Sequence, residues 1–542
     1  MTSRSLGHRA PLLWVLLPLM AGLVIGRLAW SPLSPMVETV AAVILAGIAL
    51  GFRRAWAPCL AVSVLLSGTA FYELRRARLS DWDTLPPREI RATLQVDRVF
   101  PPRPDGKSAS GLGHIAGADA HLPELAGQSV YFSLALKHGV PPPLRSSEIA
   151  VIGVLQTLPR SPPGDTFDGY LANAGVNFRL TRGRLLATVA PATAYHRFCE
   201  TALSRFDHIL DRGLERQPAL SGVFRAMLLG QQQELSEEQN LMFMQSGTMH
   251  LFSISGLHIA TIAGAVYGIL MLLRLPRWLQ VVAGAVVLWL YVDITGGTPS
   301  AVRSFIMVMF LHGSRMLRVP GSPLSALIAS AVVVLLLQPM QLFTASFQLS
   351  YGIVAALLLL GLPLTEAWLE RWKFFADLPK PAWQWHHHLR DGAWRKLLGM
   401  VSIGLASTLV STLGGVVIFK LFTPGSLVAN LVLIPVSVLV VLAGFLSLLC
   451  GLAGLGGLSV VFNYAGVLVL AGIEKSVRFF VTLPGVYHAA HFTPAWLGFA
   501  ALGGVLGAML YGYATRWELR RGGFWPPFAL TVLALVLGVS FG

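Results

Sequence analysis

The sequence is poor in charged residues and nearly devoid of cysteine. Only 12% of its 542 residues are Asp, Glu, Lys or Arg, about half the proportion found in soluble globular proteins, which excludes that class. The three cysteines, Cys59, Cys199 and Cys450, lie far apart and form no CxxC pair. This excludes a disulfide framework and a paired-cysteine metal or redox site.

Motifs for nucleotide and metal chemistry are missing as well. The only Gly-Lys-Ser, in DGKS at residues 105–108, lacks the first glycine of a phosphate-binding loop because Pro101 occupies that position. There is no HExxH, and neither HHH (residues 386–388) nor HAAH (residues 488–491) has a third acidic or cysteine ligand nearby. We therefore expect no ATPase site, no metal centre and no cofactor.

Apolar residues dominate the remainder. They make up 54% of the chain, and the mean hydropathy is +0.64. Apolar stretches of 18 or more residues are typical of membrane-spanning helices, and the chain has about thirteen spanning or partly spanning stretches. The sequence therefore predicts a polytopic α-helical membrane protein.

The positive charge is concentrated in the short segments between predicted spans. The net charge is +15, and most of it lies on one side of the membrane if the N-terminus is cytoplasmic. Because Lys and Arg favour cytoplasmic loops, the basicity indicates topology more than nucleic-acid binding. The count of spans then places the C-terminus outside.

Four segments are expected along the chain. Residues 1–79 hold three spans and are interpreted as a membrane anchor. Residues 80–191 contain β-branched and aromatic runs separated by Pro/Gly turns, which predicts a small extracytoplasmic β-barrel or sandwich. Residues 192–248 form an amphipathic helical connector, and residues 249–542 hold the remaining spans.

Polar residues recur at or inside the spans of residues 249–542, where an unsatisfied polar group is costly. The segments are HLFSISGLHI, TGGTPSAVRSFIM, FTASFQLSYG and FKLFTPGSLVANLVLIPV. Each alone is compatible with a contact between helices, but together they predict a hydrated path. The predicted path residues are His250, Ser253, Ser255, His258, Arg303, Gln348, Ser350, Lys420 and Asn430.

Three alternatives stay open. Ser255 and His258 stand at i and i+3, an arrangement compatible with a membrane-embedded hydrolase acting on a small or lipid substrate, although no G-x-S-x-G elbow is present. A secondary transporter is the second alternative, although no matching halves are visible. The third is a scaffold whose barrel only docks partners.

The motifs FRAMLLGQQQELSEEQNLMFMQSGTMHLFSISGLHI, GGTPSAVRSFIM, FTASFQLSYG and GSLVANLVLIPV follow one another between residues 224 and 436. In this order they resemble the competence domain of the ComEC family, the inner-membrane DNA channels of bacterial natural transformation. LPRSPPGDTFDGYLANAGV resembles the end of that family's extracytoplasmic oligonucleotide-binding (OB) type barrel. The HxHxDH motif of the metallo-β-lactamase-like domain in many members is absent from the sequence, so nuclease activity is not carried over.

The resemblance implies a channel, not an enzyme, that conducts single-stranded DNA across the bacterial inner membrane without its own motor or nuclease. The positive-inside rule and the count of spans place the N-terminus in the cytoplasm, and the OB-like domain and the C-terminus outside. The implied partners are single-stranded DNA, membrane lipid, an extracytoplasmic DNA receptor, a cytoplasmic ATPase motor or single-strand-binding proteins, and a separate nuclease.

Binding a single strand without sequence preference requires aromatic rings and scattered cations. The candidates on the predicted barrel are Tyr131, Phe132, Tyr170, Phe178, Arg179, Arg182 and Arg184. Three arginines follow the third span on the outer side, against the positive-inside trend, and are predicted to bind an anion there: Arg75, Arg76 and Arg78.

Overall fold

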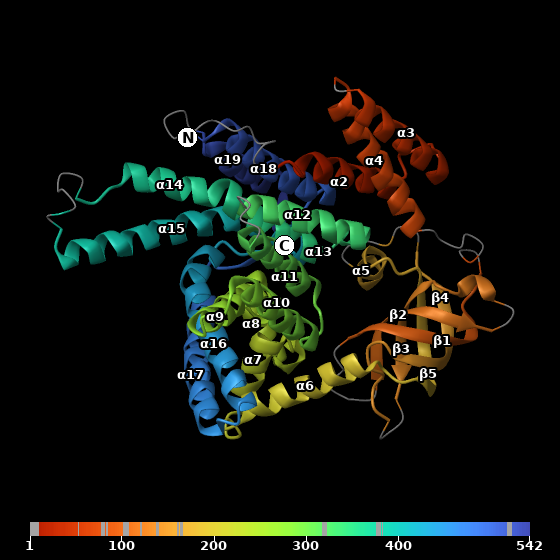
Figure 1. Ribbon diagram of the computed structural model, residues 1–542, viewed down its shortest axis with the longest axis horizontal. Coiled ribbons are helices and arrows are strands. Elements are labelled where there is room, and N and C mark those ends of the chain that lie inside the picture. The colour runs from red at the N-terminus through yellow and green to blue at the C-terminus, as the bar shows by residue number, and fades with distance from the viewer. Residues whose placement is uncertain are drawn as a thin grey trace.

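Figure 1 shows a β-barrel attached to one side of a helical domain, with the long helix α6 (Ala194–Asp211) running between them. This computed structural model describes the residues numbered 10–52, 54–76, 82, 85–100, 108–119, 122–136, 140–159, 162, 166–316, 322–375, 381, 383–517 and 523–541.

Among these residues, seven helices are long and apolar enough to cross a membrane. They are α4 (Trp56–Arg75), α10 (Arg277–Ile294), α13 continuing into α14 (Ala345–Arg371), α15 with its last turn (Trp385–Phe419), α16 (Ser426–Leu452), α17 (Gly456–Val481) and α18 (Ala495–Thr515). The shorter apolar helices are α2 (Leu13–Arg27), α3 (Pro35–Gly51), α7 (Pro218–Leu229), α9 (Gly256–Leu272), α12 (Pro323–Leu337) and α19 (Trp525–Gly538). The predicted class, a polytopic helical membrane protein with a barrel insert, is confirmed.

The barrel closes in the strand order β1-β2-β3-β5-β4, which is an OB-like arrangement of five strands. Its strands are β1 (Arg88–Val99), β2 (Ser108–Ala118), β3 (Ser129–Ala135), β4 (Glu148–Thr157) and β5 (Phe178–Ala190). Only β3 and β5 pair in parallel. Alternate side chains of each strand point inward and form one apolar core. The short helix α5 (Phe167–Asn173) lies between β4 and β5.

The helical domain contains two buried apolar cores. The first joins α6, α7, α9, α10, α16 and α17, and the second joins α2, α12, α13, α15 and α18. Small residues permit close approach in the first core, because a Cβ at Gly444 of α16 would lie 2.1 Å from Leu228 of α7. Helix α11 (Pro299–Met316) contributes side chains to both cores, so it lies at the seam between them.

Arginines at the ends of α2 and α4 hold one end of the barrel, and we call these contacts the first mount. Arg27 Nη1 donates to Asn173 Oδ1 at 2.9 Å, and its guanidinium lies 4.3 Å from the Phe343 ring centroid. Arg76 Nη1 donates to the Val176 carbonyl at 2.9 Å and to Asn177 Oδ1 at 2.7 Å. Arg76, predicted to bind an anion, is therefore engaged with the barrel.

A second mount joins the segment before β4 to α10 and α6. Arg145 Nη1 pairs with Asp293 Oδ1 at 2.5 Å, and the Asp293 side chain is only 5% exposed. Beside it, the Ser146 hydroxyl lies 3.0 Å from His196 Nδ1 in the first turn of α6. The two mounts hold the barrel at separate places on its surface.

The other end of α6 is capped by a buried side chain of α17. Asn463 Nδ2 donates to the carbonyls of Ile209 and Arg212, at 2.8 and 3.1 Å, and Ser447 donates to Asn463 Oδ1 at 2.6 Å. The last carbonyls of a helix have no partner within it, so these bonds satisfy groups that would otherwise be buried unpaired. Helix α6 is therefore fixed to the barrel at one end and to α17 at the other.

Two further features of the helical domain adjoin its second core. Short strands β6 (Leu421–Phe422), β7 (His488–Phe492) and β8 (Val539–Phe541) form a three-stranded sheet. Helices α14 (Leu362–Arg371) and α15 form a hairpin that extends beyond the neighbouring helices in Figure 1. Trp372 and Trp383 lie in the connection between these two helices, and Trp385 begins α15.

Candidate nucleic-acid interface

Four aromatic side chains gather at one end of the barrel. Phe167 and Tyr170 of α5 are 46% and 40% exposed, and their rings stack with centroids 6.0 Å apart. Tyr131 of β3 lies edge-on to Phe167 at 5.1 Å. Phe100, directly after β1, lies 6.2 Å from Tyr131 and 6.3 Å from Tyr170. The exposed rings offer flat faces on which bases can stack.

Two guanidinium groups flank the rings. Arg98 Cζ lies 5.8 Å from the Phe100 ring centroid, and Arg179 Cζ lies 6.0 Å from that of Tyr131. We call these four rings and two arginines the barrel patch. OB folds bind oligonucleotides beside strands 2 and 3 and the loops 1–2 and 4–5. The four rings of the patch come from the start of the β1–β2 connection, β3 and the β4–β5 connection, with Arg98 on β1 and Arg179 on β5.

Local bonds turn α5 so that its rings face outward. Thr166 caps the helix by accepting from the Gly169 N–H at 3.1 Å. Asp168 pairs with Arg179 at 3.3 Å, and Leu171 anchors the opposite face with no exposed surface. The patch is therefore held in shape before any ligand arrives.

The structure corrects part of the predicted set. Phe132 and Phe178 are 0% and 1% exposed in the barrel core, so they present no ring face to a base and their prediction as stacking residues is wrong. Arg182 and Arg184 are exposed on β5, but Arg184 pairs with Ala135 at the far end of β3 from the patch.

Arg75 and Arg78 are the other two arginines that the sequence predicted to bind an anion. Arg75 is exposed at the end of α4, with its guanidinium 5.8 Å from the Phe71 ring centroid. Arg78 lies outside the described residues.

Each of the four sequence motifs opens a helix. The helix α9 begins after Ser255 and α11 begins at Pro299, while α13 (Ala345–Ala356) begins after Thr344 and α16 after Gly425. We call these four helix N-termini the N-terminal cluster, a name that does not refer to the N-terminus of the chain. The cluster comprises the residues numbered 247–258, 298–304, 344–350 and 423–430.

Side-chain contacts connect the four starts. The Ser300 hydroxyl of α11 donates to the Ile254 carbonyl before α9 at 2.7 Å. A Cβ at Gly247 would lie 2.7 Å from Ser426 Cβ, which brings the segment before α9 against the start of α16. Arg303 of α11 supplies the contact to α13.

Arg303 lies at the seam between the two helical cores and is 3% exposed. Its Nη2 donates to the backbone carbonyl and hydroxyl of Ser346, at 2.7 and 2.9 Å. Its guanidinium lies 5.7 Å from the Tyr351 ring centroid. Within the described part of the chain, Nε and Nη1 have no hydrogen-bond partner.

His258 is buried and oriented by Ser255. Its Nδ1 lies 3.3 Å from the Ser255 backbone N–H and 3.0 Å from the Ser255 hydroxyl. Accepting from the N–H assigns the ring proton to Nε2. A hydrolase would need a carboxylate at that nitrogen, and no carboxylate in the described ranges bonds to it.

The other predicted path residues are distributed around the cluster. His250 is exposed and donates from Nδ1 to the Gly247 carbonyl at 3.2 Å, and Ser253 donates to the His250 carbonyl at 3.2 Å. Gln348 bonds to the Leu342 carbonyl at 3.2 Å. Ser350 and Asn430 are partly buried, and Asn430 Oδ1 has no partner among the described residues.

Lys420, the remaining predicted path residue, lies at the end of a span and not within it. It is exposed after the last turn of α15, with φ +56°, and its carbonyl accepts from the Ala490 N–H of β7 at 3.0 Å. The structure places it at the end of the span, beside the small sheet.

Residues 227–515 match the family model described as Competence protein, which covers more than half of the chain. The chain belongs to the competence protein family. The resemblance to the ComEC family drawn from the four motifs is thereby confirmed.

Two curated relatives of this competence-family chain illustrate the extent of similarity. ComE operon protein 3 of Bacillus subtilis (strain 168) is 31% identical over 143 residues, 26% of this chain and 18% of that protein. Uncharacterized protein YcaI of Escherichia coli (strain K12) is 28% identical over 225 residues, 40% of this chain and 27% of that protein. The chain thus spans less than a third of either relative's length, and no solved structure matches it.

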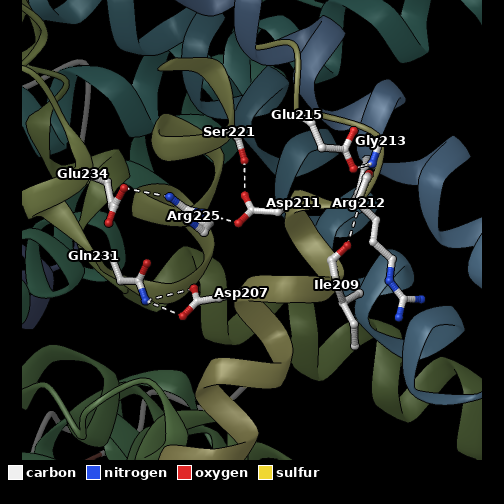
Figure 2. Close-up of polar contacts among 11 residues, drawn as sticks. Asp207, Ile209, Asp211, Arg212, Gly213, Glu215, Ser221, Arg225, Gln231 and Glu234 are labelled. Carbon is white, nitrogen blue, oxygen red and sulfur yellow. Dashed lines mark hydrogen bonds and ion pairs between the residues drawn. The ribbon is translucent and has the colours of Figure 1, made fainter. Parts of the chain in front are cut away.

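The first competence motif also builds a charged network that sequence reasoning did not single out (Figure 2). Arg225 of α7 forms ion pairs with Asp211 of α6 and, at 2.7 Å, with Glu234. Ser221 also donates to Asp211, and Gln231 donates to both oxygens of Asp207 at 3.0 and 3.3 Å. The competence motif therefore binds the end of α6 that lies far from the barrel.

Asp207 of this network gives a pH-dependent prediction. Burial raises the pKa of the Asp207 carboxyl, as do the charges of Asp211 and Glu234, against the lowering effects of the Gln231 hydrogen bond and Arg225. A raised folded-state pKa means that the ionised carboxylate destabilises the fold above that pKa, and that the penalty fades as pH falls through it towards the ordinary value of 3.8.

Asp207→Asn, which can still accept from Gln231, is therefore expected to raise the melting temperature more at pH 8 than at pH 5. Thermal unfolding of the detergent-solubilised protein at both pH values measures this difference. Glu200→Gln, on an exposed position of the same helix, is the matched control. An equal shift at both pH values for Asp207→Asn would contradict the assignment.

Proposed function

We propose that this chain is an inner-membrane channel that conducts single-stranded DNA into the cytoplasm during natural transformation. The description of its family as competence proteins supports a role in DNA uptake at the family level. The observation that carries the finer proposal is the barrel patch, in which the exposed rings of Phe167 and Tyr170 stack on each other and two guanidiniums lie beside the neighbouring rings. Stacking contributes about 1 to 3 kcal/mol per base and tolerates any sequence.

The barrel patch and the N-terminal cluster are connected by a short segment. Helix α5, which carries Phe167 and Tyr170, contacts η5 (Pro339–Phe343). After η5 the chain passes Thr344 and enters α13, where Ser346 binds Arg303. In our proposal a strand leaving the patch meets the N-terminal cluster next and passes along the seam between the two helical cores.

The four predicted segments have distinct roles in this proposal. Residues 1–79 anchor the barrel, residues 80–191 receive the strand, residues 192–248 connect the barrel to the helical domain, and residues 249–542 conduct. The proposed topology has a cytoplasmic N-terminus, with the barrel and the C-terminus outside the cytoplasm.

Conduction needs an external driving force. Moving each phosphate charge against an inside-negative potential costs roughly 2.3 kcal/mol per 100 mV, and the sequence contains no complete phosphate-binding loop. A cytoplasmic ATPase motor or single-strand-binding proteins would pull the strand inward. An extracytoplasmic receptor would deliver it, and a separate nuclease would remove its complement.

The proposal is tested by following fluorescently labelled DNA in a transformable host whose own family member is deleted. Cells carrying the empty vector are expected to hold DNA outside the inner membrane, and cells expressing this chain are expected to import it into the cytoplasm. Expression is verified by membrane immunoblot. Import equal in both strains would contradict a channel role and favour the transporter or hydrolase alternatives, which predict accumulation or turnover of a small substrate.

A further inference from the structure

We propose that the N-terminal cluster is a binding site for a phosphodiester group, formed by the starts of α9, α11, α13 and α16 together with the guanidinium of Arg303. The inference rests on the proposed function and adds the chemical group that the channel recognises at this point.

The first observation is the orientation of the four helices. Each has at least 12 residues, and each begins within a connected set of contacts. A helix start carries unpaired N–H groups and about half a positive charge, which favours phosphate. None of the four segments of the cluster contains Asp or Glu, so no neighbouring carboxylate within these segments cancels the field.

The second observation is independent of the helix dipoles. Arg303 is buried, yet two of its donor nitrogens lack a partner among the described residues. No carboxylate forms an ion pair with it in the described ranges. A buried guanidinium without a counter-charge is strongly unfavourable, and an oxyanion would supply both the charge and the missing acceptors.

The third observation is access. Ser346, which accepts from Arg303 Nη2, is itself exposed. The Arg303 guanidinium therefore contacts an exposed side chain of the first turn of α13. A phosphate that displaces the Ser346 hydroxyl would reach Arg303 without opening either apolar core.

A site of this kind complements the barrel patch. The patch recognises the bases, and the cluster recognises the backbone that every nucleotide shares. Both interactions are indifferent to sequence, so the strand could advance one phosphate at a time. The phosphate of a lipid headgroup has the same chemistry, and the test separates the two sources.

The experiment measures binding of a fluorescein-labelled 20-nucleotide oligothymidine to the full chain in phosphate-free dodecyl maltoside, by anisotropy over a series of KCl concentrations. A second probe of the same length has uncharged methylphosphonate linkages. The variants are Arg303→Gln, Arg303→Lys to retain the charge, and Arg277→Gln as a control for loss of one exposed arginine at the start of α10.

For the phosphodiester probe, Arg303→Gln is expected to weaken binding roughly tenfold and to make the slope of log K against log salt shallower by about 0.7, the value for one phosphate of a single strand. Arg303→Lys should restore part of the affinity and Arg277→Gln should resemble wild type. The methylphosphonate probe should not distinguish the variants. Monodisperse gel filtration of each variant verifies folding.

Wild-type affinity and salt slope in Arg303→Gln would overturn this inference and leave the proposed function intact. If the wild-type protein bound neither probe, both the phosphodiester-site inference and the proposed function would be contradicted. Repeating the measurement in nanodiscs with and without phosphatidylglycerol identifies the source of the phosphate. Competition by this lipid that disappears in Arg303→Gln would assign the site to a headgroup and overturn the assignment to DNA.

Discussion

Replacing Phe167 and Tyr170 together by alanine is expected to weaken binding of single-stranded DNA to the intact protein by about 100-fold, because each lost stacking surface contributes about 1 to 3 kcal/mol. The two side chains are 46% and 40% exposed and are not part of the barrel core, so the double substitution leaves that core unchanged. The buried Leu171 and the cap by Thr166 still hold α5 in place.

The measurement is anisotropy of a labelled oligothymidine at fixed salt, with an abasic strand of equal length as a second probe. The abasic strand should bind wild type and double variant alike, because it keeps its phosphates and lacks bases. Phe198→Ala, which removes a 54% exposed ring of α6 outside the patch, is the matched control. Equal oligothymidine affinity in the double variant and wild type would exclude the barrel patch as the base-binding surface.

Reversing the charge of Arg145 is expected to reduce cytoplasmic import of DNA at least tenfold while leaving oligonucleotide binding to the barrel patch intact. Arg145→Asp places a carboxylate against Asp293, whose side chain is 5% exposed. Leaving such a charge unpaired costs about 2 kcal/mol or more. Because the Arg145 side chain itself is 44% exposed, the effect should be loss of the second mount without unfolding of the barrel.

The double variant Arg145→Asp with Asp293→Arg restores opposite charges and should recover import. Spin labels at the exposed positions Leu186 of β5 and Trp278 of α10 should report a broader distance distribution in the single variant and a narrow one in the double variant. An import defect that the swap does not repair, with an unchanged distance distribution, would show that the contact does not position the barrel.

The sequence predicts the elements whose signals are local. The spans, the barrel strands and the amphipathic helix α6 all follow from periodicity and turn residues. The sheet of β6, β7 and β8 does not, because strands of two to five residues give no periodic pattern. The HAAH segment, which was considered and rejected as a metal site, lies in the middle strand of that sheet.

The candidate barrel residues show where sequence reasoning fails. Successive residues of a strand point to opposite faces, and Phe132 follows Tyr131 directly. Composition does not reveal which of the two faces the core, since a shift of one residue in register exchanges them. The sequence does contain a signal for Phe167. Thr166 is a typical helix N-cap residue, and Phe167 stands three residues before Tyr170, so the two rings lie on one face of that helix.

Arg76 shows that a sequence does not identify contact partners that are uncharged and distant along the chain. The sequence predicted an anion-binding use for its positive charge, whereas the structure shows that charge in contact with the barrel. Two of its partners are a backbone carbonyl and the Asn177 amide oxygen of the barrel, which are about 100 residues away in the sequence. Neither of these two groups carries a charge, so no pattern of charges in the sequence identifies these two contacts.

The two mounts of the barrel fix the distance between the barrel patch and the N-terminal cluster. In the proposed function they therefore determine the effective concentration, at the cluster, of a strand bound to the patch. A domain on a single flexible tether explores a volume, and the local concentration of its cargo at a second site falls as the tether lengthens. Held by Arg27 and Arg76 at one place and by Arg145 at another, the barrel keeps its patch at one separation from the start of α13. Under the proposed function, the release of a strand from the barrel and its capture by the helical domain would be steps of one intramolecular transfer, whose rate would depend on the length of strand between the sites and not on diffusion of the barrel.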